Sequence, residues 1–298
     1  MNYLFTLFLL LLSSCSTLQV YTPSDNPPKL PDGPAIHQPL RLALVLGGGG
    51  ARGIAHVGVL EVFQENDIPI DLIIGCSAGS IVGALYADNP NTDNLKNVFL
   101  NLKTSYLTDF DLWHAKYGLC QGKSLRRFLC QHLSAQNFDE LQIPLYIVAT
   151  DLYSSELVPI GGGPIVPAVE ASAAIPFFFI PVWLHGRALV DGSVIDPVPV
   201  RVAKQFDADT IVAVDLRGLL PNQFPTNLFG VAERSADITL LWQSETCVKD
   251  AHVIIRPELD DDIGCFAKEA YYETIYLAGR KAALKMLPEI KKRLCISQ

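Results

Sequence analysis

The sequence predicts an α/β fold with a mainly parallel sheet, and two observations carry this expectation. Short apolar runs at residues 41–46, 72–74 and 144–150 alternate with segments of helical periodicity. Glycine-rich turns follow the first two runs, as is typical where a parallel strand leads into a crossover helix. We therefore expect one domain, residues 40–298, built around such a sheet.

The expected elements follow in chain order. Helices are predicted at residues 54–66 and 80–87, and the more polar residues 88–140 have a mainly helical pattern that could cover a site. The remaining expected elements are a turn at 161–164, a small-residue helix at 167–175, strands at 187–190, 210–215 and 252–256, a helix ending at 206, a loop at 219–229, and helices at 232–245 and 271–293.

The N-terminus resembles that of an exported lipoprotein. Residues 3–12 form an apolar run that matches the core of a signal peptide and is shorter than the ~20 residues of a membrane-spanning helix. Leu12-Ser13-Ser14-Cys15 follows and resembles a bacterial lipobox. We expect residues 1–15 to be a signal peptide, Cys15 to carry the lipid, and residues 16–39, rich in Pro and Ser, to be a flexible tether. No Lys or Arg precedes the run, so an uncleaved anchor and a misassigned start codon stay open.

Charge and cysteine content limit the partners. A net charge of −8 argues against a nucleic-acid partner, whereas a lipid anchor would still bring the chain to a membrane. That anchor indicates the bacterial cell envelope, with the outer membrane favoured. The seven cysteines match no metal-site spacing. Disulfides Cys120–Cys130 or Cys265–Cys295 and buried free thiols are equally open.

The first glycine turn, residues 47–53, reads Gly-Gly-Gly-Gly-Ala-Arg-Gly. Glycines expose backbone N–H groups, and a following helix N-terminus favours negative charge, either a bound phosphate or a transient oxyanion. Gly48–Gly53 also fits the GxGxxG fingerprint of dinucleotide sites. That fingerprint needs an acidic residue at the end of the second strand, whereas Asp71 precedes that strand.

The second turn, Gly75-Cys76-Ser77-Ala78-Gly79, lies between an apolar strand and an apolar helix. This is the nucleophile-elbow pattern, in which flanking glycines permit a tight turn that exposes a serine hydroxyl. The alternative is a packing turn in which Ser77 only caps the helix.

A serine nucleophile needs a base. Of the six histidines, none lies in a motif typical of a catalytic loop, although His185 or His252 would serve a Ser–His–Asp esterase. Asp191 ends a predicted strand and precedes Gly192. We expect it at the carboxyl edge of the parallel sheet, near Ser77. An ordinary strand-ending turn is the alternative.

Several blocks in order make the chain resemble the patatin-like phospholipases, specifically the bacterial members, over residues 41–216. They are the glycine block with Arg52-Gly53, the stretches 55–60 and 83–87, Ala149-Thr150-Asp151, residues 171–176 and Leu189-Val190-Asp191-Gly192. Cys76, Phe177 and Ser193 depart from the residues that are usual there, which bears on substrate fit more than on catalysis.

The resemblance implies a three-layer α/β/α sandwich and hydrolysis of phospholipid or lysophospholipid acyl esters by a Ser77–Asp191 dyad. Such a dyad needs no metal or organic cofactor. Because a free aspartate is a weak base, we expect an apolar pocket to raise the pKa of Asp191. The amides of Gly48, Gly49 and Gly50 would bind the oxyanion, and Arg52 would hold this loop or meet a phosphate headgroup. Two alternatives remain: the α/β-hydrolase esterase, and a non-catalytic surface lipoprotein that binds lipid or a host partner.

Overall fold

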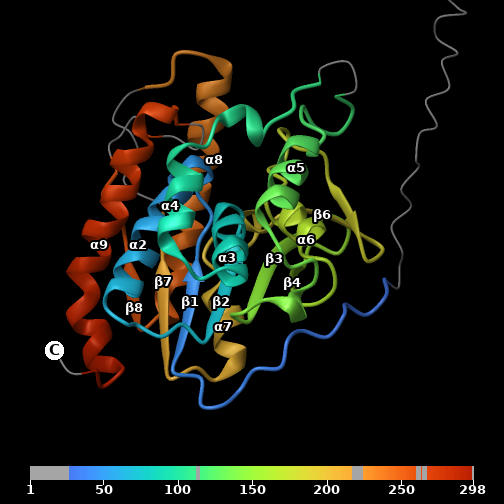
Figure 1. The fold of residues 1–298 in the computed structure, drawn as a ribbon. Helices are drawn as coiled ribbons and strands as arrows, with labels where there is room; N and C mark the ends of the chain where they lie inside the picture. The colour runs from blue at the N-terminus through green and yellow to red at the C-terminus, as the bar shows by residue number, and fades with distance from the viewer. Residues whose placement is uncertain (1–26, 112–114, 217–223, 260–262, 264–266, 297–298) are drawn as a thin grey trace, which may run out of the picture.

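The structure, a computed structural model, describes residues 27–111, 115–216, 224–259, 263 and 267–296 (Figure 1). The predicted signal peptide, Cys15 and the first part of the predicted tether lie outside these residues. One sheet has the strand order β5-β6-β3-β2-β1-β7-β8, with β4 paired to β3. The strands are β1 (Leu42–Leu46), β2 (Leu72–Cys76), β3 (Leu145–Asp151), β4 (Leu157–Ile160), β5 (Val182–Leu184), β6 (Arg187–Asp191), β7 (Thr210–Val214) and β8 (Val253–Ile255).

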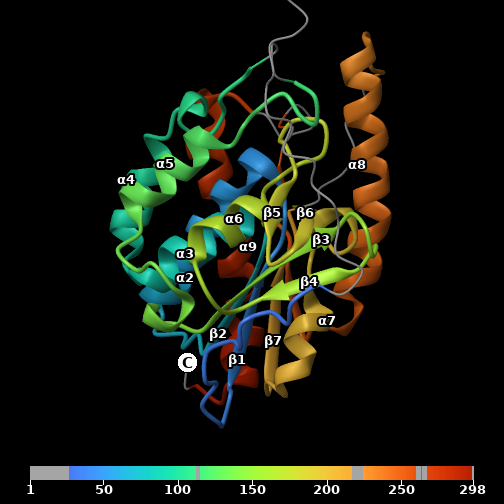
Figure 2. The ribbon, with the colours of Figure 1, turned by 90° about the vertical axis from the view of Figure 1, so that its right-hand side faces the viewer.

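Helices cover both faces of the sheet, as the two views show (Figures 1 and 2). The helices of the larger layer are α2 (Ile54–Glu65), α3 (Ala78–Asp88), α4 (Thr92–Leu100), α5 (Lys123–His132), α6 (Ile165–Ser172) and α9 (Tyr272–Arg293). The opposite layer holds α7 (Val200–Ala203) and α8 (Leu228–Cys247). The three-layer α/β/α sandwich agrees with the expected fold.

The central position of β1 in the sheet explains why its sequence is apolar throughout. Leu42, Leu44 and Leu46 belong to the core under the larger helical layer, whereas Ala43 and Val45 belong to the core that contains α7 residues. A strand with both faces covered buries every side chain, so it has no polar alternation.

Strands β1, β2, β3, β7 and β8 run parallel to one another, as predicted. Strands β4 and β5 were not predicted, and β6 runs antiparallel to β3. β4 contains Pro159 and pairs only with β3, which fits the restriction of proline to strand edges. β5 is apolar but only three residues long, Val182-Trp183-Leu184, which is too short a run to be identified as a strand from its pattern.

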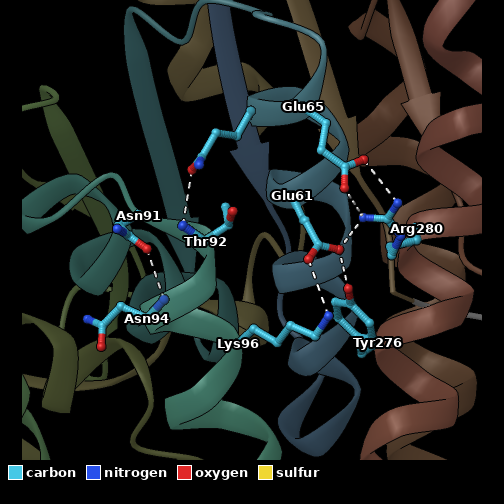
Figure 3. A network of polar contacts seen from close by, with 9 residues as sticks. Glu61, Glu65, Asn91, Thr92, Asn94, Lys96, Tyr276 and Arg280 are labelled. Atoms are coloured by element: carbon cyan, nitrogen blue, oxygen red, sulfur yellow. Dashed lines mark hydrogen bonds and ion pairs between the residues drawn. The ribbon is translucent and has the colours of Figure 1, made fainter.

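The last helix, α9, is fastened to α2 by close backbone contact and by a polar network (Figure 3). A Cβ on Gly58 of α2 would lie 2.2 Å from the Tyr276 carbonyl oxygen, and one on Gly279 of α9 would lie 2.0 Å from that of Ala55. Glu61 of α2 accepts hydrogen bonds from Tyr276 and Arg280 of α9. Glycine at both positions thus lets the helices touch.

Part of the segment at residues 27–39 contacts the domain. Leu30 packs on the core, and a Cβ on Gly33 would overlap the Tyr146 hydroxyl. The described end of the predicted tether thus touches the domain at these points, and the domain boundary at residue 40 stays a prediction.

Of the two alternatives left open for Cys120 and Cys130, a disulfide or free thiols, the structure has free thiols. Cys120 is buried where its backbone N–H donates to Phe178. Cys295 is also free, and Cys265 lies outside the described residues.

None of the helices in the described part of the chain combines the length and apolarity that crossing a bilayer requires.

Candidate active site

Ser77 lies in the sharp turn between β2 and α3. Its backbone angles are φ 52° and ψ −121°, a conformation that costs free energy for a residue with a side chain and is typical of a nucleophile elbow. A Cβ on Gly75 would lie 2.7 Å from Ser80 Cα, and one on Gly79 would lie 2.0 Å from the Leu46 carbonyl oxygen. Both glycines that the pattern contains are thus required by close backbone approach.

Asp191 reaches this turn from the opposite direction. β2 pairs with β3 up to Cys76 and Val148, and β6 pairs with β3 from Asp191 and Ala149. β4 overlaps both of these segments of β3, so β2 and β6 share the other edge of β3. The two strands therefore meet end to end, and their last residues become neighbours.

This arrangement corrects one step of the sequence analysis. The strand before Asp191 was expected to run parallel to the others and to end at their carboxyl edge. It runs antiparallel, and Asp191 arrives beside Ser77 because its strand points into the sheet from that edge.

The two side chains are in direct contact. Ser77 Oγ donates to Asp191 Oδ2 at 2.6 Å, and the residues are only 4% and 3% exposed. Asp191 Oδ1 accepts from the Ser193 N–H at 2.8 Å, which fixes the carboxylate plane. The N–H of Ser77 donates to Ser172 Oγ at 2.9 Å. Ser172 is a residue whose role the sequence did not reveal, because its serine occurs in a helix of small residues with no distinguishing pattern.

The first glycine turn passes directly beside Ser77. A Cβ on Gly48 would lie 2.3 Å from Ser193 Oγ and 3.2 Å from Ser77 Cβ. The Gly48 N–H, however, donates to the Pro197 carbonyl oxygen at 2.9 Å. Of the three predicted oxyanion donors, Gly48 is thus already engaged in the fold. No such bond from the N–H of Gly49 or Gly50 occurs among the described residues.

His56 of α2 holds the first glycine turn through a hydrogen bond to its backbone, a role that was not predicted from the sequence. Its Nε2 lies 2.8 Å from the Gly47 carbonyl oxygen, which can only accept, so Nε2 carries the proton. Burial lowers the pKa of His56 to about 4. The imidazole is therefore neutral at physiological pH and serves as a fixed hydrogen-bond donor.

Arg52 contacts other parts of the chain from within the same loop. Its Nε donates to the Ile263 carbonyl oxygen at 2.8 Å, and its guanidinium lies 3.6 Å from an Asp237 carboxylate oxygen of α8. With 8% exposure, Arg52 holds the glycine turn to the C-terminal part of the chain. These contacts correspond to the loop-holding alternative for this residue.

The histidines of the triad alternative lie elsewhere. His252 precedes β8, where its Nδ1 accepts from the Ile211 N–H at the start of β7, the sheet edge opposite to Ser77. His185 lies in the β5–β6 turn, beyond Arg187. Arg187 is four residues, about 13 Å of strand, from Asp191. Neither ring is near the hydroxyl. Asp71, considered for a nucleotide site, accepts from the Arg41 and Leu42 N–H groups at the amino edge.

An apolar pocket of about 120 Å³ opens onto Ser77. Residues 88–140, expected to cover a site, contribute part of its wall. The lining residues come from the glycine turn, the start of α2, α3, α4, α5, α9 and the loops that follow α4 and α6. They include Gly50, Ile81, Val82, Phe99, Leu102, Leu107, Leu125, Ile175, Phe179 and Tyr272. The pocket therefore offers hydrocarbon contacts on the side where a serine-bound group would extend.

Comparison with known proteins supports these observations. A relative from mouse, patatin-like phospholipase domain-containing protein 6, is 31% identical over 208 residues, which are 68% of this chain and 15% of that protein. An NTE family protein of Mycobacterium tuberculosis is 34% identical over 179 residues, 60% of this chain and 49% of that one. The matches thus span half or less of these relatives' lengths.

The fold has a counterpart among solved structures. VipD from Legionella pneumophila superposes with a TM-score of 0.57 at 14% identity, over 89% of this chain and 72% of that one. The family model of patatin-like phospholipases matches residues 44–204, from the first strand to beyond Asp191. The chain belongs to the patatin-like phospholipase family.

Proposed function

We propose that this protein hydrolyses acyl esters of phospholipids or lysophospholipids, with Ser77 as nucleophile and Asp191 as general base. The observation that carries the proposal is the 2.6 Å hydrogen bond from Ser77 Oγ, which lines the apolar pocket, to Asp191. Membership of the family supports the same class of reaction.

In the first step, Ser77 Oγ attacks the ester carbonyl carbon while Asp191 Oδ2 takes the hydroxyl proton. The tetrahedral oxyanion accepts hydrogen bonds from the N–H groups of Gly49 and Gly50, and it lies near the N-terminus of α3, whose dipole favours negative charge. Collapse breaks the bond to the leaving alcohol. That alcohol takes the proton from Asp191, and an acyl-serine remains.

In the second step, water attacks the acyl-serine. Asp191 accepts a proton from this water, and the same amides bind the second oxyanion. Collapse releases the fatty acid and returns the proton to Ser77 Oγ. A carboxylate that contacts the serine directly performs both proton transfers, so the mechanism needs no histidine.

The pocket supports a lipid substrate. Aliphatic and aromatic side chains such as Val82, Phe99 and Leu125 line it, and each buried CH₂ of an acyl chain would gain about 0.8 kcal/mol. The scissile carbonyl at Ser77 would place the acyl chain inside and the headgroup outside.

We also propose that Cys15 anchors the protein in the bacterial envelope, with the outer membrane favoured. The support is the lipobox-like Leu12-Ser13-Ser14-Cys15 after an apolar run. Diacylation plus an N-acyl chain exceeds the two signals that stable anchoring requires.

A lipid-class hydrolysis panel tests the catalytic proposal. The purified protein should release fatty acid from at least one phospholipid or lysophospholipid and should turn over a p-nitrophenyl ester. Ser77→Ala should abolish both activities and keep the native circular dichroism spectrum. Activity above a few per cent in folded Ser77→Ala, or no turnover of any ester by the native chain, would refute it; the second result would favour the non-catalytic lipoprotein.

A further inference from the structure

Three exposed aromatic residues lie on the two loops that contribute Leu107, Thr108, Ile175 and Phe179 to the pocket wall, and we call Phe110, Tyr117 and Phe177 the aromatic rim. They are 61%, 54% and 58% exposed. Single exposed aromatics are common on protein surfaces, but these three come from two loops that the backbone joins. Leu119 N–H donates to the Phe177 carbonyl, Cys120 N–H to that of Phe178, and Phe110 forms a bridge with Cys120.

The rim is continuous with the pocket. On one loop, Leu107 and Thr108 line the pocket and precede Phe110. On the other, Ile175 and Phe179 line it and flank Phe177. Apolar surface thus extends from the wall beside Ser77 to the outside of the molecule. A lipid that leaves an aggregate would reach the pocket without its acyl chain crossing water.

Phe177 has an unusual backbone. Its φ is 74°, a left-handed conformation that is rare for bulky residues, and its ring packs edge-on against Phe178 with 5.4 Å between centroids. The bonds to Leu119 and Cys120 hold the loop in this shape. A strained position that exposes a large apolar ring destabilises the free protein, which motivates a search for function.

The local charge indicates the kind of surface that the rim meets. Residues 101–127 contain five Lys or Arg and two Asp. Arg126 pairs with Glu170 of α6, so four Lys or Arg against two Asp leave a net charge of +2 in a chain of −8. Lys103, Lys116 and Lys123 are exposed, and no carboxylate of the described residues pairs with them. Asp109, in contrast, accepts from the Gly122 and Lys123 N–H groups. Exposed lysines on and beside the loop that carries Phe110 and Tyr117, with Lys116 Nζ 5.0 Å from the Tyr117 ring centroid, suit an interface of anionic headgroups over acyl chains.

We propose that the aromatic rim inserts into the surface of an anionic phospholipid bilayer and presents the pocket mouth to it. This inference rests on the proposed function for its purpose, but insertion is measurable without hydrolysis. The full chain carrying Ser77→Ala and Cys15→Ser, which has neither nucleophile nor lipidation site, is the parent for the test.

Phe177→Trp in this parent places a reporter in the rim, and Leu284→Trp is the matched control. Leu284 is 48% exposed on α9, twelve residues (about 18 Å of helix) beyond Tyr272, the α9 residue that lines the pocket. The emission difference from the parent removes the signal of the three native tryptophans. With vesicles of brominated phosphatidylglycerol and phosphatidylcholine, the Trp at 177 should shift to the blue and be quenched, and the Trp at 284 should not. No quenching at 177, or equal quenching at both positions, overturns the proposal.

Phe177→Gly gives a second, independent test. Glycine adopts φ 74° without strain, so the variant should be at least as thermally stable as the native chain. Its partition onto anionic vesicles should fall about tenfold, the scale of one aromatic ring removed from the interface. Leu284→Ser should leave partition unchanged. A lysine pair, Lys116→Gln with Lys123→Gln, should lower binding about fivefold per lysine on anionic vesicles only.

In the nucleophile-intact chain, Phe177→Gly should keep its rate on a soluble p-nitrophenyl ester and lose rate on vesicles. If Phe177→Gly binds anionic vesicles as strongly as the chain with Phe177 does, insertion is contradicted, whatever the esterase assay shows. If the chain hydrolyses no ester but the Trp at 177 is still quenched, only the proposed function is contradicted.

Discussion

Among single side chains, Asp191 makes the contact on which the proposed chemistry depends. Asp191→Asn retains an oxygen that can accept from the Ser193 N–H, so the local fold should persist, but the amide cannot accept the proton of Ser77. We expect kcat to fall about 10³-fold, within the range of general acid–base contributions. Steady-state kinetics on a soluble ester, with a thermal melt to verify folding, measures this.

The two histidine variants are the controls. His185→Ala and His252→Ala should retain most activity, because both rings lie away from Ser77 Oγ. If either folded variant loses as much activity as Asp191→Asn, a histidine is the base and the dyad is wrong.

The lowered pKa of His56 determines how the stability of the fold should depend on pH. Its pKa is lowered by burial to about 4 in the folded protein, against 6.5 in the unfolded chain. The unfolded state therefore binds more protons between these values, and the free energy of unfolding should fall as pH decreases from 6.5 to 4. The loss should be about 3 kcal/mol, from 1.36 kcal/mol per pKa unit.

The measurement is urea unfolding at several pH values between 4 and 7.5. His56→Gln can still donate to the Gly47 carbonyl but has no titrating group, so its stability should vary less over this range than that of the native chain. His37→Gln, at an exposed position, should follow the native curve. If the free energy of unfolding of His56→Gln varies with pH as steeply as that of the native chain, groups other than His56 cause the pH dependence.

At the scale of elements, the active-site turn could be predicted and the route of its partner could not. Gly75 and Gly79 identify the elbow in the sequence, because close approach of the backbone leaves no room for a Cβ at either position. Asp191 was found through an assumed parallel strand, yet β6 is antiparallel. Strand direction depends on pairing between distant segments, which local pattern does not encode. The same limit applies to Gly48, whose amide is engaged by Pro197 from another part of the chain.

The contact between α2 and α9 gives an element-scale prediction. A Cβ on Gly279 would lie 2.0 Å from the Ala55 carbonyl oxygen, and backbone cannot move aside as a side chain can. Gly279→Ala should therefore destabilise the fold by about 1–3 kcal/mol, as overpacking does, although alanine favours helices. Urea unfolding measures it. Thr274→Ala, at an exposed position on the same helix, should change stability by less than about 0.5 kcal/mol, and an equal effect of both would exclude the backbone contact as the cause.

For the whole molecule, the place where the chain enters the domain relates the predicted anchor to the active site. Pro27 and Pro28 pack near Gly186 in the β5–β6 turn. β6 runs from this turn to Asp191, so the chain enters the domain at the far end of the strand that carries the proposed base. Residues 16–26 can span at most about 40 Å. An anchor at Cys15 would thus hold the β5–β6 turn within about 40 Å of the membrane.

Substitution at Cys15 tests this arrangement in cells. Lipidation requires the thiol, so Cys15→Ser should prevent acylation and leave either an unprocessed precursor or a protein released from the membrane fraction. Intact mass spectrometry should find the native chain beginning at Cys15 with added acyl mass, and fractionation should find it in the outer membrane. Cys130→Ser, an exposed free thiol, is the matched control and should change neither result. Unchanged mass and fractionation in Cys15→Ser would refute lipidation. The aromatic rim would then be the remaining proposed membrane contact, and membrane association should fall in Phe177→Gly.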